Sequence, residues 1–275
     1  FVRDRAGALL SFSFAAVIGF VNTVTLTRYN CFATSLTANL FFIGLTFYRC
    51  DVTHKGCDSE WVASGWKLLM IVCNLLGVGV VCAVLHARPG AGASTLAPLL
   101  LFAMVAADGL QEQALWRFGL DHDEELYCMS SVTLVAFAMG AASFLTSPSA
   151  PGTRLNAITA AVTQHLQSNT ELGCRWLLAG RSSVGEDERS KAVNACAIVG
   201  GLAAGVLIAS ILLVLNPLAP PSDRYLFTLG GVALFAVLQS HDRWAPSRAG
   251  ASSAAPLASL REPLNAGASR DGKGS

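Results

Sequence analysis

Long apolar blocks with almost no charge are the feature that most constrains how this 275-residue chain folds. Between Ala6 and Tyr48 the only charged residue is Arg28, and comparable blocks recur along most of the sequence. A block of about 18 or more such residues is long enough to cross the hydrocarbon core of a membrane as a helix. Since several blocks occur, the sequence predicts an all-α, polytopic transmembrane helical bundle.

The charge content agrees with a lipid bilayer as the main partner. Charged residues make up 13% of the chain, against about 25% in ordinary soluble domains. The net charge is +1, so nucleic acid is not an implied partner. The sequence is compatible with a homo-oligomer. No nucleophile-elbow, metalloprotease, phosphate-loop or dinucleotide motif occurs, so we expect no enzymatic activity, cofactor or metal site.

Turn-forming residues divide the apolar sequence into eight helical segments. The segments are Ala6–Leu26, Cys31–Tyr48, Trp61–His86, Thr95–Trp116, Leu126–Ser147, Leu155–Gly180, Ala192–Leu215 and Tyr225–Ser240. The second and sixth contain polar stretches and either cross the membrane or enter and leave it on one side. We therefore expect six to eight membrane segments.

The order of matching residues predicts two tandem repeats, in residues 1–125 and 126–240. The stretch "AAVIGFVNTVT" at 15–25 aligns with "AFAMGAASFLT" at 136–146, and "TANL" at 37–40 aligns with "TQHL" at 163–166. Farther on, Lys67 aligns with Lys191 and Gly77 with Gly201. Internal repeats of this kind are common in transporter folds.

The C-terminal residues 241–275 differ from the rest, because they are rich in Ser, Ala, Gly and Pro. Such a composition cannot bury enough apolar surface to offset the entropy of ordering. We predict a disordered cytoplasmic tail.

Lys and Arg in the short loops are compatible with two topologies. If all eight segments cross, the repeats are parallel; if the second and sixth are re-entrant, six spans remain and the repeats are inverted. Both arrangements place both termini in the cytoplasm, at a plasma or organellar membrane. They differ at the loop with Cys50 and Cys57, which faces outward only with six spans, where an oxidising environment would allow a disulfide.

Polar residues inside repeat-related segments form the predicted binding site: Asn22, Thr37, Asn39, Ser143, Thr163 and His165. Thr37 and Asn39 point to nearly opposite faces of a regular helix, so this helix is either surrounded by protein or broken there. Two interpretations remain open. The polar groups fix helix packing through hydrogen bonds, or they line a midplane site for an unknown small molecule.

Charged residues at the ends of the apolar blocks suggest further roles. Asp108 follows fourteen uncharged residues and shares a helix face with Glu112, which marks an ion or proton pathway or else the membrane interface. Lys67 and Lys191 begin their spans, so we expect both to extend toward the lipid headgroups.

Several short motifs resemble the YoaK-like family of polytopic membrane proteins (domain of unknown function 1275), over about Leu9 to Gln239. In that family a glycine and an Asp or Asn in the first span precede a "TGN"-type motif, and the second half has a "MGLQN"-like span and a "TG"-type segment. The matching residues are Gly19, Asn22, Thr37 and Asn39, then Met139, Gly140, Thr163 and His165.

The chain departs from this pattern at several positions. Asn22 stands where an acid is common, Ala38 replaces the motif glycine, "GAASF" replaces "GLQN" and "TQH" replaces the second "TG" motif. Loss of the acid weakens any proton coupling through the first span. The resemblance implies a membrane bundle but no established substrate.

These observations lead to two functional hypotheses. The first is a small-molecule transporter or permease with a polar site between repeat-related segments. The alternative is a non-transporting membrane scaffold or assembly protein, whose polar residues only pack the bundle.

Overall fold

The computed structural model of the chain describes residues 2–53, 57–88, 93–118, 124–145, 170, 185–215 and 225–244. Within these ranges the chain forms seven long helices and no strands. The helices are α1 (Val2–Tyr29), α2 (Leu36–Thr53), α3 (Cys57–Ala87), α4 (Ala93–Phe118), α5 (Glu124–Leu145), α7 (Glu186–Leu215) and α8 (Leu226–Trp244).

Four of these helices are long and apolar enough to cross a membrane. Their candidate spans are Gly7–Tyr29 in α1, Glu60–Ala87 in α3, Ala93–Gln111 in α4 and Glu188–Leu215 in α7. Large apolar side chains such as Phe102 and Leu207 point outward, with 69% and 61% of their surface exposed. An apolar surface of this extent suits contact with lipid. The expectation of an all-α membrane protein is therefore confirmed.

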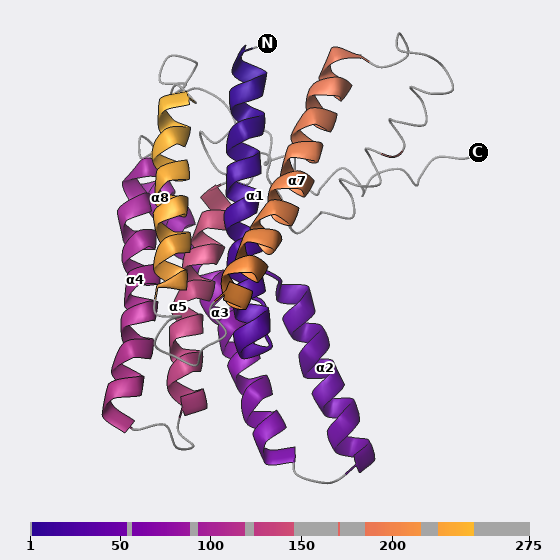
Figure 1. The fold of residues 1–275 in the computed structure, drawn as a ribbon, viewed down its shortest axis with the longest axis vertical. Coiled ribbons are helices and arrows are strands. Elements are labelled where there is room, and N and C mark those ends of the chain that lie inside the picture. The colour runs from indigo at the N-terminus through magenta and orange to yellow at the C-terminus, as the bar shows by residue number, and fades with distance from the viewer. Residues whose placement is uncertain are drawn as a thin grey trace, which may run out of the picture.

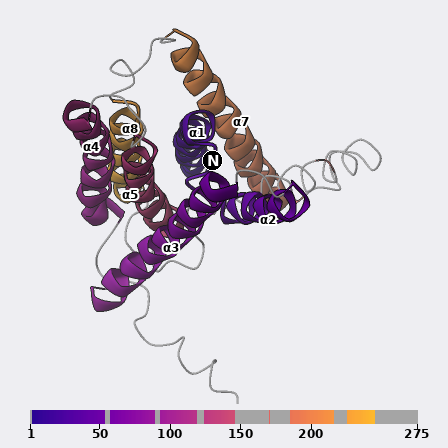
Figure 2. The same cartoon turned by 90° about the horizontal axis from the view of Figure 1, so that it is seen from below.

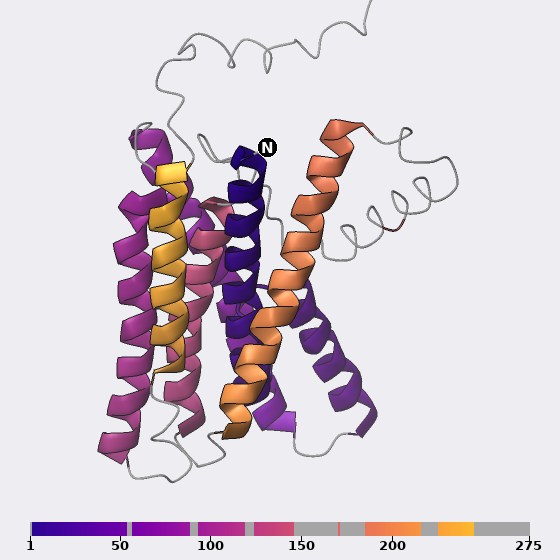
Figure 3. The same cartoon turned by 45° about the horizontal axis from the view of Figure 1, so that its top comes forward.

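The helices pack in pairs (Figure 1). α1 lies along α7, α3 lies along α5, and α4 contacts both α5 and α8. α8 also packs on α1, and Figure 3 shows it between α4 and α1. Among the described helices, α2 makes its main contacts with α3 and lies at their periphery (Figure 2).

Contacts between named residues fix the helix directions. Along α1 and α7, Phe12 lies beside Gly201 and Ala16 beside Gly205, so these helices are parallel. Gln239 near the end of α8 contacts Ser94 at the start of α4, and Thr228 at the start of α8 contacts Asp108 farther along α4. These two helices are therefore antiparallel. The colour gradient of Figure 1 relates these pairs to the other helices: α1, α4 and α7 run one way, and α3, α5 and α8 run the other.

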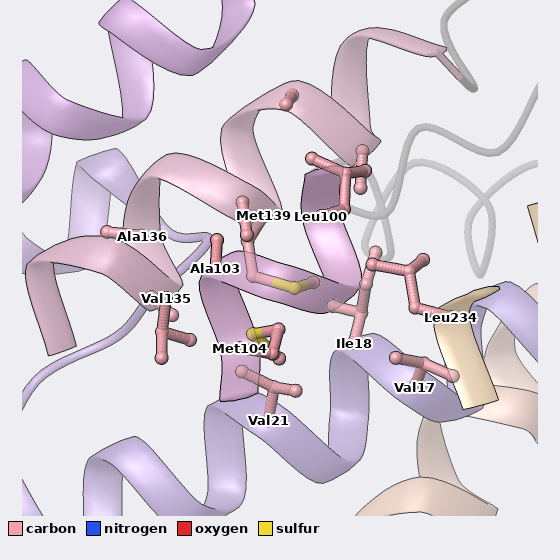
Figure 4. Packing of buried hydrophobic residues seen from close by; sticks show 14 of the residues in the cluster. Val17, Ile18, Val21, Leu100, Ala103, Met104, Val135, Ala136, Met139 and Leu234 are labelled. Atoms are coloured by element: carbon pink, nitrogen blue, oxygen red, sulfur yellow. The ribbon is translucent and has the colours of Figure 1, made fainter. Parts of the chain in front are cut away.

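The hydrophobic core lies where α1, α4, α5 and α8 meet (Figure 4). Its central side chains are fully or almost fully buried, and they come from all four helices. They include Val17, Ile18 and Val21 of α1, Leu100, Ala103 and Met104 of α4, Val135, Ala136 and Met139 of α5, and Leu234 of α8.

Glycines allow the closest helix approaches. A Cβ atom on Gly19, Gly201 or Gly205 would overlap a backbone carbonyl across the α1–α7 contact. A Cβ atom on Gly77 or Gly140 would do the same across the α3–α5 contact. Small residues at such crossings let membrane helices pack backbone to backbone.

Some helix boundaries differ from the expected ones. α1 begins at Val2, because charged residues beside an apolar block can continue a helix outside the hydrocarbon layer. α8 continues to Trp244, past the expected start of the tail. The predicted segment Leu155–Gly180, except Thr170, and residues 245–275 of the predicted tail lie outside the described residues.

Candidate functional site: a chain reversal between α1 and α2

The polar residues that stand out in the sequence surround a reversal of the chain between α1 and α2. α1 ends where Asn30 takes a left-handed conformation with φ of 49°, which Asn tolerates better than most residues. The N–H of Asn30 still donates to the Leu26 carbonyl oxygen at 3.0 Å, and the N–H of Cys31 donates to the Thr25 carbonyl oxygen at 3.5 Å. Residues 30–35 then form a non-helical connection, here named the 30–35 turn.

Asn22 of α1 holds the far end of the 30–35 turn. Its Nδ2 donates to Thr34 Oγ1 at 2.6 Å, and its Oδ1 accepts the Thr34 backbone N–H at 3.2 Å. Asn22 precedes the end of α1 by about two helical turns. The chain therefore runs back alongside α1 before α2 begins.

Asn39 of α2 closes the other side of the turn. Its Oδ1 accepts the Phe32 N–H at 3.0 Å, and its Nδ2 donates to the Phe32 carbonyl oxygen at 2.7 Å. Ser35 acts as the N-cap of α2, since its Oγ accepts the Ala38 N–H at 3.3 Å. Asn22 and Asn39 thus each use both ends of the side-chain amide in hydrogen bonds to residues of the turn.

Asn74 of α3 fixes the depth of the turn in the bundle. Its Nδ2 donates to the Ala33 carbonyl oxygen at 3.1 Å and to the Ala136 carbonyl oxygen of α5 at 3.2 Å. Asn74 lies at the centre of the span Glu60–Ala87. The 30–35 turn is therefore anchored at the middle of a membrane-length helix, between α1, α3 and α5.

Two of the other predicted site residues, Thr37 and Ser143, lie in the described part of the chain. Thr37 is exposed on the outer side of α2, while Asn39 is buried, so the helix is regular at these positions and broken just before them. Ser143 is half-buried on α5, about two helical turns beyond Ala136. Thr163 and His165 lie outside the described residues.

Asp108 of α4 serves the start of α8. Its side chain is buried, and its Oδ2 accepts the N–H of Thr228, in the first turn of α8, at 2.5 Å. A helix N-terminus carries partial positive charge and unpaired N–H groups, so it favours a carboxylate there. The side chain of Glu112 lies outside the described part of the chain.

A second polar cluster lies near Asp108. Gln111 of α4 donates from Nε2 to the Tyr29 hydroxyl and to Ser131 Oγ, the latter at 3.0 Å. The Tyr29 ring stacks on Phe227 of α8 with centroids 6.2 Å apart. The end of α1 is thereby tied to α4, α5 and α8.

Cys50 and Cys57 form a disulfide between the end of α2 and the start of α3, with Cα atoms 5.6 Å apart. The bond lies at the end of the bundle opposite to the first residues of α1 (Figure 1). It holds α2 to α3, its main contact among the described helices.

Sequence reasoning missed Asn74 and misjudged Lys67. Asn74 is a lone amide in the apolar stretch "IVCNLLG", and such a residue in a span generally has a partner inside the bundle. Lys67 was expected to extend toward the headgroups, but it is 7% exposed and its ammonium lies 5.3 Å from the centroid of the Phe42 ring. Lys191 is exposed.

No curated protein and no solved structure matches the chain. Residues 10–238 match the sequence model of a family described as "Protein of unknown function (DUF1275)". This match covers most of the chain, including every helix that surrounds the 30–35 turn, and it confirms the family resemblance seen in the short motifs. The chain therefore belongs to the DUF1275 family, and its apolar helices make it an integral membrane protein.

Proposed function

We propose that this protein is a transporter or permease for a small hydrophilic molecule, whose site includes the 30–35 turn. The observation that carries the proposal is the anchoring of Ala33 by Asn74 at the centre of the α3 span. Non-helical backbone at membrane depth persists only where protein surrounds it or where it lines a water-filled cavity. In secondary transporters, discontinuous helices at the midplane commonly form the substrate site.

Repeated glycine contacts support an internal repeat. Gly19 approaches the carbonyl of Leu202, and Gly140 approaches the carbonyl of Asn74. The two glycines, Gly19 and Gly140, are 121 residues apart in the sequence. The two residues whose carbonyls they approach, Asn74 and Leu202, are 128 residues apart.

The opposite contacts repeat with the same separations. Gly205 approaches Ala16 and Gly77 approaches Phe137, where Gly77 and Gly205 are 128 residues apart and Ala16 and Phe137 are 121 apart. The sequence motifs align Gly77 with Gly201, whereas these contacts pair Gly77 with Gly205. These backbone contacts support the second register over the one from the short motifs.

Helix directions support inversion of the two repeats. α1 and α5 run in opposite directions, and so do α3 and α7, and α4 and α8 (Figure 1). α2 runs in the same direction as α1, because Phe42 lies at Lys67 and Ala33 at Asn74 on the antiparallel α3. We infer six spans with a re-entrant turn, rather than eight.

This topology has a consequence for the orientation. The start of α1 and the end of α8 lie at one end of the bundle, and the Cys50–Cys57 disulfide lies at the other (Figure 1). Disulfides persist on oxidising faces. We propose that both termini are cytoplasmic and that the disulfide faces the opposite compartment.

α2 is the element best placed to move. Among the described helices it packs mainly on α3 and leans away from the others (Figure 2). Elements with few contacts open at low free energy, and the 30–35 turn supplies a non-helical connection at which α2 can swing. Movement of α2 would expose the turn to one side of the membrane.

A specific observation favours the alternative of a non-transporting scaffold. The amides of Asn22 and Asn39 each make two hydrogen bonds to the turn, so both already have structural partners. In that case the turn is a packing device. The two functions differ in whether solute crosses the membrane.

Solute uptake into proteoliposomes tests the proposal. The vesicles are diluted into a mixture of amino acids, sugars, polyols and small anions, and the solutes that they take up are measured by mass spectrometry. Protein-free liposomes give the background. We expect accumulation of at least one solute class, reduced about ten-fold or more by Asn74→Leu, because the turn loses its anchor. Asn194→Leu on α7 is the matched control and leaves uptake unchanged. No accumulation by folded protein would favour the scaffold.

A further inference from the structure

One face of α3 lies against α2 along its first half. Trp61 packs edge-on against Phe47 with ring centroids 4.7 Å apart, Lys67 lies over Phe42, and Asn74 reaches Ala33. Lys67 and Asn74 are seven residues apart and share one helix face, whereas Trp61 precedes Lys67 by six residues and lies about 120° around the helix from it. Ser64 lies between Trp61 and Lys67 around the helix.

Lys67 is a charged group held inside the bundle. It is 7% exposed and lies well inside the span Glu60–Ala87. Trp61 packs on Phe47 near the start of α3, and Asn74 bonds to Ala33 at the centre of its span. Phe42 lies between these two contacts, at about the depth of Lys67 itself. The ammonium therefore stays at this depth rather than extending to the headgroups.

The ammonium has no counter-charge within the described part of the chain. There the ammonium lies over the Phe42 ring and close enough to the buried Cys31 side chain for the two to interact electrostatically. A cation–π contact compensates only part of the cost of removing an ammonium from water. An uncompensated charge at this depth is expensive, and charged groups inside membrane spans generally have a partner or a function.

Ser64 supplies a second unused donor beside Lys67. It is 5% exposed, and its Oγ has no hydrogen-bond partner within the described residues. Ser64 and Lys67 are three residues apart on the helix, so their side chains are neighbours. A buried hydroxyl usually finds an acceptor. An ammonium and a hydroxyl that both lack an acceptor complement a small anion.

We propose that Lys67 and Ser64 form a binding site for a small monovalent anion between α3 and α2. The inference rests on the proposed transport function, to which it adds the substrate class. The anion would neutralise the ammonium and accept the Ser64 hydroxyl, and the Phe42 ring would orient the lysine. Because α2 packs mainly on α3, its movement opens this site and the adjacent 30–35 turn together.

Thermal unfolding of the full chain in phosphatidylcholine nanodiscs tests this site, since a zwitterionic lipid supplies no anionic headgroup. Chloride, nitrate or acetate replaces gluconate, an anion too bulky for two packed helices, at constant ionic strength. We expect a saturable rise in Tm with at least one of the three anions, of about 5 °C at 100 times its Kd.

Variants separate binding from packing. Lys67→Met should abolish the anion-dependent rise while keeping or raising Tm in gluconate, because it removes an uncompensated charge and keeps the volume. Ser64→Ala should weaken binding about five- to thirty-fold. Lys191→Met, at an exposed lysine in the second turn of α7, should respond as the native chain does.

Two results would overturn the site: no rise with any of the three anions, or a rise that survives Lys67→Met. The uptake assay separates this outcome from failure of the transport proposal. Accumulation of a neutral or cationic solute that Lys67→Met leaves unchanged would contradict the anion site but support the transport function. Anion binding that depends on Lys67, without uptake of any solute, would support the anion site but contradict the transport function.

Discussion

The Nδ2 atom of Asn74 lies 3.1 Å from the Ala33 carbonyl oxygen, which joins the centre of α3 to the non-helical turn between α1 and α2. The same amide nitrogen lies 3.2 Å from the Ala136 carbonyl oxygen of α5. One side chain thus connects the 30–35 turn to the packed bundle. The depth of the turn, and with it the proposed transport site, depends on this amide.

Replacing Asn74 by Ala should lower the free energy of unfolding by about 1–3 kcal/mol, because its hydrogen bonds to the 30–35 turn and to α5 are lost. Unfolding by SDS titration in micelles measures the change. Asn194→Ala on α7 is the control and should stay within about 0.5 kcal/mol of the native chain. Equal stability of the two variants would show that Asn74 does not hold the turn.

Gly77→Ala should destabilise the bundle by about 1–3 kcal/mol, because the new Cβ overlaps the Phe137 carbonyl and forces α3 from α5. Gly79→Ala on the same helix meets nothing within 4 Å and should be neutral or slightly stabilising. If the repeats are inverted as proposed, Gly205→Ala costs about as much as Gly77→Ala. A neutral Gly205→Ala would argue against that register.

Asp108→Ala should destabilise the protein by about 1–3 kcal/mol, because the first turn of α8 loses the acceptor of its Thr228 N–H and a favourable charge. Asp108→Asn keeps an acceptor oxygen and should cost less. Gly109→Ala, where nothing lies within 4 Å, is the neighbouring control. Unfolding titrations in detergent compare the variants. A cost for Asp108→Asn equal to that of Asp108→Ala would assign the effect to charge rather than capping.

Cys50 and Cys57, kept as the only cysteines, should react with a membrane-impermeant maleimide from outside intact cells only after reduction. A separate variant in which Cys replaces Gly7, near the start of α1, should react only after the membrane is opened. Labelling of both sites from the same side would contradict the six-span topology. Reduction should also lower stability by about 2–3 kcal/mol, because the cross-link closes a short loop.

Much of the architecture could be predicted from the sequence, because membrane spans need long uncharged blocks and turns need breakers. The "RYN" break appears in the structure as the left-handed Asn30 at the end of α1. The second segment was expected to begin at Cys31, but α2 begins at Leu36. Residues 31–35 contain no Gly or Pro to mark a turn, and hydrogen bonds from the distant amides of Asn22, Asn39 and Asn74 help to hold them there.

The candidate site was predicted in part, since Asn22 and Asn39 both surround the turn while Thr37 does not. An Asn in a membrane span predicts that its amide has a hydrogen-bond partner, but the sequence does not show which backbone group is that partner. Lys67 shows the same limit. Its position near the start of a span favours extension toward the headgroups, and only the packing of α2 over α3 reveals that it is buried.

The central claim is that the 30–35 turn belongs to a solute pathway rather than to a dry packing contact. Thr34 is half-buried in the turn, beside Asn22, and can be replaced by Cys in a chain without other free cysteines. An impermeant methanethiosulfonate reagent is then applied from each side of sealed, oriented proteoliposomes. A pathway predicts reaction from at least one side. A folded protein in which this cysteine reacts from neither side would contradict the account.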